Sequence, residues 1–185
     1  MPGLDLPGSF IDLPKINGAL GELKLHMHRQ AQEQIVSADV GRLSDCAALF
    51  AVTTQGKLHI VNLDELKTLN TMQLQNPCSL VRAFKDFPDF IFLAVQQNQQ
   101  YFLHVQTPSV LIESQDFPHM APITDIMFAQ IKNQNLVFTS AQDKKLRVFE
   151  LSKVGENFKL TRIFEQATGD IFVTKFLISP TNPSF

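Results

Sequence analysis

Apolar positions in this sequence recur with a fixed spacing. Three windows of fifteen residues, 49–63, 93–107 and 137–151, align without gaps at a constant offset of 44 residues. Each window has an apolar stretch, a polar turn and a second apolar stretch, which predicts two antiparallel strands joined by a hairpin. The first and third windows match best, with identities at Phe50/Phe138, Lys57/Lys145, Leu58/Leu146 and Leu63/Leu151.

The same spacing extends to both sides of the windows. Short segments rich in β-branched and aromatic residues precede them, at residues 35–40, 79–84 and 123–128. Further strand-like segments follow them, at residues 67–74, 110–114 and 158–164. The repeat therefore predicts four strands in each unit.

Four short strands every 40 to 45 residues or so is the period of a β-propeller blade, a small antiparallel sheet that stacks against its neighbours. The competing interpretation is a helical repeat. No window of 12 residues has a sustained apolar stripe at helical spacing, and the best helical candidate is residues 64–69. We therefore expect an all-β protein, a partial β-propeller with about three four-stranded antiparallel blades plus incomplete flanking blades.

The predicted organisation follows from the phase of the repeat. It comprises a flexible lead-in at 1–8, an incomplete blade of outer strands at 9–34, blades at 35–76, 77–118 and 119–165, and the start of a further, truncated blade at 166–185. An open propeller would expose unpaired backbone and apolar faces. Three alternatives are open: a fragment, a truncated gene model, or a chain completed by a partner.

The third window, VFTSAQDKKLRVFEL, resembles a WD repeat. Asp143 stands at the turn aspartate of that pattern and Phe149 at its tryptophan, while His119 precedes the first strand as the family's histidine does. The resemblance implies that His119 and Asp143 hydrogen-bond across the blade and fasten the turn to the incoming loop. Ala141 stands where this network usually has serine or threonine.

The other two windows match the WD pattern less well. In the first, Thr53 takes the serine or threonine place, and Gly56 suits a tight hairpin because glycine adopts positive φ without a Cβ penalty. The second has Gln97, Gln99 and Val105 at the diagnostic places and retains none of the signature. We expect His119, Asp143, Phe149, Thr53 and Gly56 to form the structural network of the blades.

Residues 119–126 are also similar to the corresponding blade of WD-repeat subunits in Rix-type pre-ribosome processing complexes. This resemblance implies a role in ribosome biogenesis and ribosomal RNA processing, and a nuclear location.

Charge and composition exclude several classes. A net charge of −2 gives no general basis for binding nucleic acid or a membrane surface, no apolar run is long enough to span a membrane, and the N-terminus lacks a signal-peptide pattern. We expect an intracellular protein, cytoplasmic or nuclear. Cys46 and Cys78 lack zinc-ligand spacing and are interpreted as reduced thiols.

The local basic concentration is Lys144, Lys145 and Arg147. Contact with RNA or a phosphoinositide is one interpretation, and a solvated hairpin is the other. If the first holds, the chain is a nucleic-acid or phosphoinositide binding propeller.

Phe84, Phe87 and Phe90 form a second candidate contact, since a phenylalanine-rich loop can anchor a partner. The alternative is that these rings fill the interface between adjacent blades.

Catalytic, cofactor-binding and metal-binding patterns are missing from the sequence. The carboxylates fall in turns and strand ends, where aspartate caps the backbone, and His26 and His28 share one strand face without a third ligand nearby. We therefore expect a non-catalytic scaffold that binds protein subunits of a larger complex, without cofactor, metal or evident small-molecule substrate. A propeller-based enzyme is the less favoured alternative.

Overall fold

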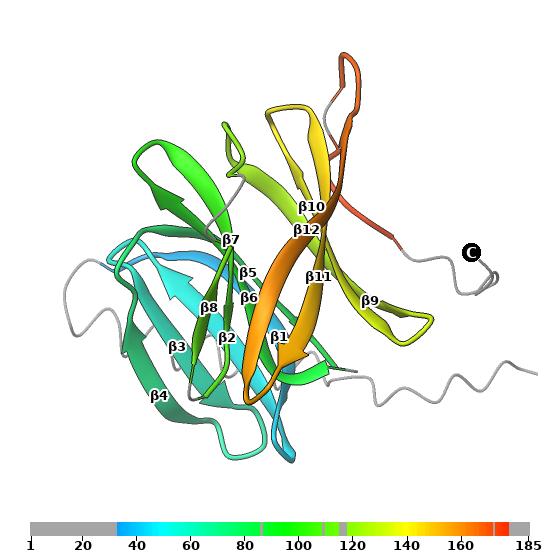
Figure 1. The fold of residues 1–185 in the computed structure, drawn as a ribbon. Helices are drawn as coiled ribbons and strands as arrows, with labels where there is room; N and C mark the ends of the chain where they lie inside the picture. Colours follow the sequence, from blue (N-terminus) through cyan, green and yellow to red (C-terminus); the bar gives the residue numbers. More distant parts are fainter. Residues whose placement is uncertain (1–32, 86, 109, 115–117, 172, 178–185) are drawn as a thin grey trace, which may run out of the picture.

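The computed structural model of the chain describes residues 33–85, 87–108, 110–114, 118–171 and 173–177. These residues form twelve strands and contain no helix (Figure 1). The strands belong to three separate sheets of four strands each.

Each sheet is built from four strands that are consecutive in the chain. The first sheet contains β1 (Ile35–Leu43), β2 (Cys46–Thr53), β3 (Lys57–Asn62) and β4 (Lys67–Gln73). The second contains β5 (Cys78–Phe84), β6 (Phe87–Gln97), β7 (Gln100–Gln106) and β8 (Leu111–Glu113). The third contains β9 (Ile123–Ile131), β10 (Gln134–Ala141), β11 (Lys145–Val154) and β12 (Asn157–Ala167).

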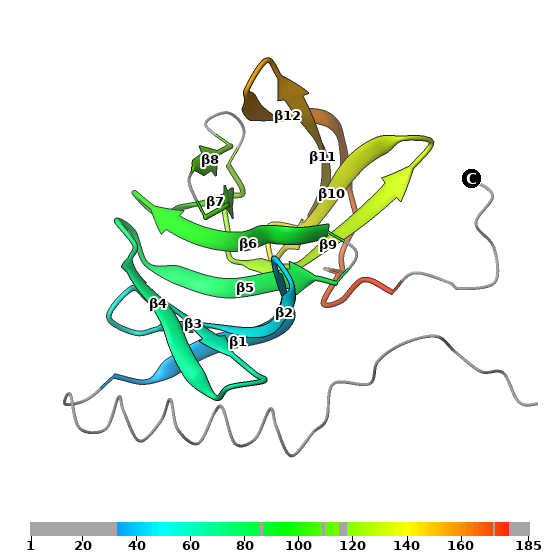
Figure 2. The ribbon, with the colours of Figure 1, turned by 90° about the horizontal axis from the view of Figure 1, so that it is seen from below.

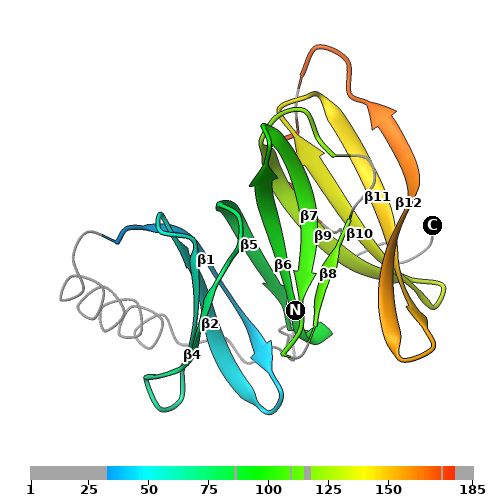
Figure 3. The same cartoon turned by 60° about the vertical axis from the view of Figure 1, so that its left-hand side comes forward.

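Within each sheet, every strand pairs antiparallel with the next strand in the chain, so each sheet is a simple meander. The three sheets stand side by side in chain order (Figure 3). Their first strands meet, β1 with β5 and β5 with β9. Tight turns make the meander possible: Gly56 takes a φ of 72° between β2 and β3, and Asn98 and Gln99 take 51° and 64° between β6 and β7.

Alternation along the strands explains how the sheets pack. On β7, Leu103 and Val105 point into an apolar cluster shared with the third sheet, whereas Phe102 and His104 point the other way. A second apolar cluster joins the first two sheets and includes Phe50 from β2 and Leu93 from β6. The second sheet is therefore buried on both faces, and Figure 2 shows β5 and β6 between the strands of its two neighbours.

Polar side chains on the first strands also join the sheets. Ser37 Oγ accepts a hydrogen bond from the Val81 N–H at 3.2 Å, and Asp39 Oδ2 accepts one from the Ala83 N–H at 3.0 Å. Burial raises the pKa of Asp39, and hydrogen bonds from the Ala83 and Val40 N–H groups act to lower it. Gly41 lies so close to β5 that a Cβ there would be 2.6 Å from the Ala83 Cβ. The contact between neighbouring sheets is thus specific as well as apolar.

The fold class expected from the repeat is confirmed: the chain is all-β, with three four-stranded antiparallel sheets. Each strand segment predicted between residues 35 and 164 overlaps an observed strand. The helical candidate at residues 64–69 is instead a turn that leads into β4, with Leu66 at a φ of 53°. The predicted lead-in at 1–8, most of the incomplete blade at 9–34 with His26 and His28, and residues 178–185 lie outside the described residues.

The gapless alignment of the second window is wrong after its turn. Leu49 pairs with Val61 and Val137 with Phe149, but Leu93 pairs with His104. The β6–β7 turn is therefore one residue shorter than its two counterparts. His104, and not Val105, occupies the place that Phe149 holds in the third sheet.

Candidate functional site

His119 sits where the second and third sheets meet. Its backbone forms an antiparallel bridge with Tyr101 of β7, through hydrogen bonds of 2.8 and 2.9 Å. Its ring faces the third sheet, where Nδ1 lies 3.0 Å from both carboxylate oxygens of Asp143, in the β10–β11 turn. One residue thus ties the edge of one sheet to the turn of the next.

Asp143 also organises its own turn. Oδ2 accepts a hydrogen bond from the Met120 N–H at 3.0 Å, and Oδ1 accepts one from the Lys145 N–H at 3.1 Å. A carboxylate with three donors around it satisfies backbone groups that a tight turn leaves without partners.

The hydroxyl partner of His119 is Thr139 on β10, whose Oγ1 lies 2.9 Å from Nε2. The WD pattern has this hydroxyl at the position of Ala141, but here Thr139, two residues earlier, supplies it. Because Asp143 can only accept, Nδ1 carries the proton and Nε2 accepts a hydrogen bond from the Thr139 hydroxyl. Phe149 is 2 % exposed and packs in the cluster between the second and third sheets.

The threonine, histidine and aspartate have the residue types of a nucleophile, a base and an orienting acid. Their surroundings do not suit that chemistry. Thr139 is fully buried and His119 is 2 % exposed, so a substrate has no access to the hydroxyl. Burial, together with the charge of Arg147, lowers the pKa of His119 to about 4, although Asp143 acts to raise it. The arrangement is therefore suited to holding two sheets together.

The predicted basic hairpin is largely neutralised by carboxylates. Arg147 is 3 % exposed, and its Nε donates to Glu165 Oε2 at 2.7 Å. Lys145 Nζ donates to Glu165 Oε1 at 2.8 Å, and Lys144 Nζ lies 3.8 Å from a carboxylate oxygen of Asp170. Hydrogen bonds from Lys145 and Arg147 lower the pKa of Glu165 to about 2. This geometry does not favour the hairpin as a site for RNA or phosphoinositide.

The three phenylalanines of the second candidate contact pack between sheets. Phe87 stacks on Phe128 of β9 with ring centroids 4.2 Å apart, and Phe90 meets Phe158 of β12 edge-on at 5.1 Å. Phe84 lies 5.9 Å from Phe128. All three are half-buried, which favours the packing interpretation over an exposed anchor.

In the first sheet, Thr53 and Gly56 both serve the β2–β3 turn. Thr53 Oγ1 accepts a hydrogen bond from the Lys57 N–H at 3.2 Å, and the Gly56 N–H donates to the Thr53 carbonyl at 2.9 Å. Sequence reasoning overlooked a buried polar group beside them. His59 on β3 lies 3.0 Å from Thr71 Oγ1 and 3.7 Å from a Glu33 carboxylate oxygen.

Asp125 on β9 contacts both neighbouring segments. Its Oδ1 accepts a hydrogen bond from Arg82 Nε on β5 at 3.0 Å, and its Oδ2 accepts one from the Phe176 N–H at 2.8 Å. Residues 173–177 thus lie along the third sheet much as β5 lies along the first, although they form no regular strand. The sequence predicts the start of a further blade at 166–185, but it gives no sign of the role of Asp125.

Other chemistry has little support in the described part of the chain. No group of three or more histidine, cysteine or acidic residues could hold a metal ion there, and no described helix is long and apolar enough to cross a membrane. Both cysteines are free, and burial raises the pKa of the Cys78 thiol to about 12.

Comparisons with known proteins give structural neighbours only. No protein-family model and no curated protein matches the chain. The β-propeller domain of Cps50 (Swd1) from Myceliophthora thermophila is 13% identical with a TM-score of 0.49, over 91% of this chain and 50% of that one. Hsv2 from Kluyveromyces marxianus is 12% identical with a TM-score of 0.44, over 66% and 34%. KlHsv2 with loop 6CD replaced by a Gly-Ser linker is 14% identical with a TM-score of 0.45, over 71% and 40%.

This chain spans half or less of the length of each of those proteins. Because each of these TM-scores is below 0.5, the class of protein is defined by the sheets themselves. Three successive four-stranded meanders, stacked face to face with their first strands together, make the chain part of an unclosed β-propeller.

Proposed function

We propose that the chain is a non-catalytic scaffold that binds other protein subunits and works inside the cell. The observation that carries this proposal is the state of its polar clusters. The one with catalytic residue types, Thr139, His119 and Asp143, is buried and occupied in joining two sheets. These side chains therefore stabilise the contact between two sheets, and a rigid fold suits a platform for assembly.

The test is to purify the full-length protein from its native source under mild conditions and measure its mass by light scattering. A scaffold elutes in an assembly with partner subunits at fixed stoichiometry. Elution of the free chain alone, across a range of salt concentrations, would overturn the proposal.

Within this class we propose a ribosome-assembly complex as the setting, with a nuclear location. The support is the similarity of residues 119–126 to a blade of pre-ribosome processing subunits. The test is sedimentation of the intact protein with pre-ribosomal particles, combined with analysis of ribosomal RNA precursors after depletion. A protein that neither sediments with these particles nor alters the precursors when depleted has no role in this pathway.

A further inference from the structure

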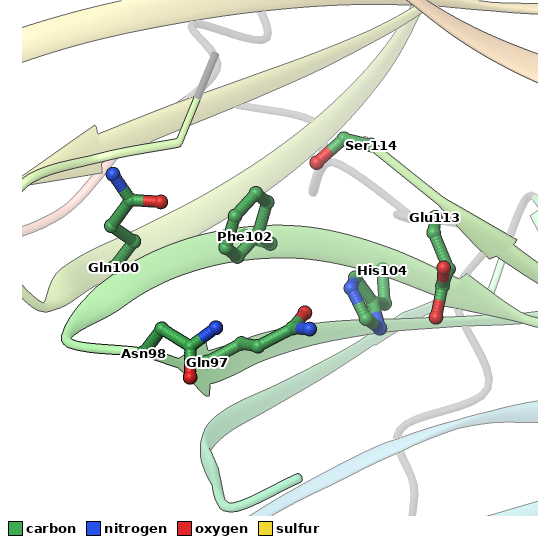
Figure 4. Close-up of a pocket in the computed structure, with 7 residues that line it drawn as sticks. All are labelled: Gln97, Asn98, Gln100, Phe102, His104, Glu113 and Ser114. Carbon is green, nitrogen blue, oxygen red and sulfur yellow. The ribbon is translucent and has the colours of Figure 1, made fainter. Parts of the chain in front are cut away.

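A cavity of about 310 Å³ opens on the second sheet. Figure 4 shows the side chains that line it, among them Gln97, Asn98, Phe102, His104, Glu113 and Ser114. They come from the end of β6, from the β6–β7 turn, from β7, and from the end of β8 and the residue after it.

The cavity faces the first sheet. Phe102 and His104 lie on the face of β7 opposite to Leu103 and Val105, which pack against the third sheet. A smaller cavity beside it shares His104 and Glu113, and is also lined by Leu74, just after β4. The site therefore lies between the outer strands of two sheets, away from the first strands where these sheets make close contact.

The shorter β6–β7 turn explains why a polar cavity forms here. It puts His104 opposite Leu93, at the place where Phe149 fills the corresponding space in the third sheet. It also puts Phe102 opposite Val95, where the third sheet has Arg147 opposite Thr139. The second sheet thus lacks the buried ion pairs of the third and presents an aromatic ring and an imidazole instead.

His104 is buried but has no hydrogen-bond partner among the described residues. It is 5 % exposed, and burial lowers its pKa, while the charge of Glu113 directly opposite on β8 acts to raise it. A neutral imidazole offers one donor and one acceptor. The ring nitrogens of His104 are not among the fully buried atoms without a partner, so a ligand in the cavity can pair with them. In the view of Figure 4 the ring lies between the Gln97 carboxamide and the Glu113 carboxylate.

The other lining groups are rich in acceptors. Glu113 supplies the only carboxylate among the lining residues, and Gln97 and Asn98 add amide oxygens. Ser114 Oγ accepts a hydrogen bond from the Leu103 N–H at 3.1 Å and keeps a second lone pair. The carboxylate favours a cation, and the neutral oxygens around it can accept further hydrogen bonds from the N–H donors of that cation.

We propose that this cavity binds an arginine side chain of a partner protein. A guanidinium has five donors in a plane, which suits a carboxylate and several neutral acceptors, and its flat face packs on an aromatic ring such as Phe102. An ammonium has three donors and no flat face. The cavity is at the lower end of the range for ligand sites, about 300–1,000 Å³, as expected for one side chain.

The experiment uses the full-length protein and N-acetyl-arginine amide as probe, with the His104 ring signals followed by NMR. Saturable shifts are expected at millimolar probe, the affinity range expected for a fragment that makes few contacts. The citrulline analogue, which has the same shape without the charge, is expected to bind at least about tenfold more weakly. No shift at His104, or equal binding of citrulline, would overturn the proposal. Equal binding of the lysine analogue would overturn the assignment to arginine.

Matched variants separate the cavity from nonspecific charge effects. Glu113→Gln is expected to weaken arginine binding about tenfold. Glu156→Gln, at an exposed position in the β11–β12 turn, makes the same change elsewhere and is expected to leave binding unchanged. Circular dichroism checks that both variants fold. Unchanged binding in Glu113→Gln contradicts the proposal.

This inference rests on the proposed scaffold role, but the two can fail separately. If native complexes form equally well with Glu113→Gln and the probe does not bind, the scaffold stands and the cavity assignment falls. If arginine binds at His104 and the native protein has no partner subunit, the cavity assignment stands and the scaffold falls.

Discussion

Asp143→Ala tests the view that the His119 network joins two sheets. The substitution removes the acceptor for three donors: His119 Nδ1, the Met120 N–H and the Lys145 N–H. The Asp143 side chain is only 7 % exposed, so water replaces it poorly. Arg147 keeps its closer partner, Glu165, and adds little to the loss.

The expected cost follows from these donors. A buried donor without a partner costs about 1–3 kcal/mol, and a donor that water can reach costs much less. With one donor fully buried and two in a turn near the surface, we expect a loss of about 3 kcal/mol in the free energy of unfolding. For a domain of this size that corresponds to a fall of roughly 6–12 °C in Tm.

Urea unfolding followed by far-UV circular dichroism measures this change, since the chain has no tryptophan. Asp143→Asn keeps an acceptor oxygen and is expected to lose less. Asp170→Ala, whose side chain is fully exposed, serves as the control and should change stability by less than about 0.5 kcal/mol. A loss below about 1 kcal/mol in Asp143→Ala, or a loss equal to that of the control, would refute the reasoning.

Three further predictions concern other parts of the molecule. Gly41→Ala should lower the free energy of unfolding by about 1–3 kcal/mol, because its Cβ would lie 2.6 Å from the Ala83 Cβ. The double variant with Ala83→Gly should recover part of that loss in urea unfolding. Additive losses in the two single variants and the double variant would contradict the predicted clash. The pKa of His119, about 4, is below the value of about 6.5 in an unfolded chain, so its contribution to stability is present above pH 6.5 or so and is lost as the pH falls toward 4. The difference in the free energy of unfolding between wild type and His119→Asn, measured by urea unfolding, should therefore shrink by about 3 kcal/mol over that range, and a constant difference would contradict this prediction. Burial raises the pKa of Cys78 to about 12, so in a thiol-reagent assay of the native protein Cys46 should react while Cys78 reacts only after unfolding; two fast thiols would show that Cys78 is accessible.

Much of this fold could be predicted because the signals are local. Alternation of apolar and polar residues depends on the geometry of a single strand, and tight turns on the few residues that form them. The 44-residue spacing of residues 49–63, 93–107 and 137–151 was enough to predict four strands per unit and an all-β chain. The resemblance to a WD repeat also picked out His119 and Asp143, whose side chains the structure places 3.0 Å apart.

The register of the hairpins could not be predicted from the sequence. Three windows that align without gaps conceal a β6–β7 turn that is one residue shorter, because residue similarity does not report which backbone groups pair. That single residue decides that His104 and not Val105 faces Leu93, and with it the chemistry of the cavity on the second sheet.

The tertiary structure likewise determined which residues far apart in the sequence contact one another. The sequence shows Arg147 as part of a basic cluster, and only the pairing of β11 with β12 brings Glu165 within 2.7 Å and buries the charge. Only the stacking of sheets puts Asp125 between Arg82 and Phe176. The sequence by itself thus determined the repeat and its strands. The register of the turns and the stacking of the sheets determined which polar groups meet, because hydrogen bonds and ion pairs require distances of a few ångströms that no spacing along the chain specifies.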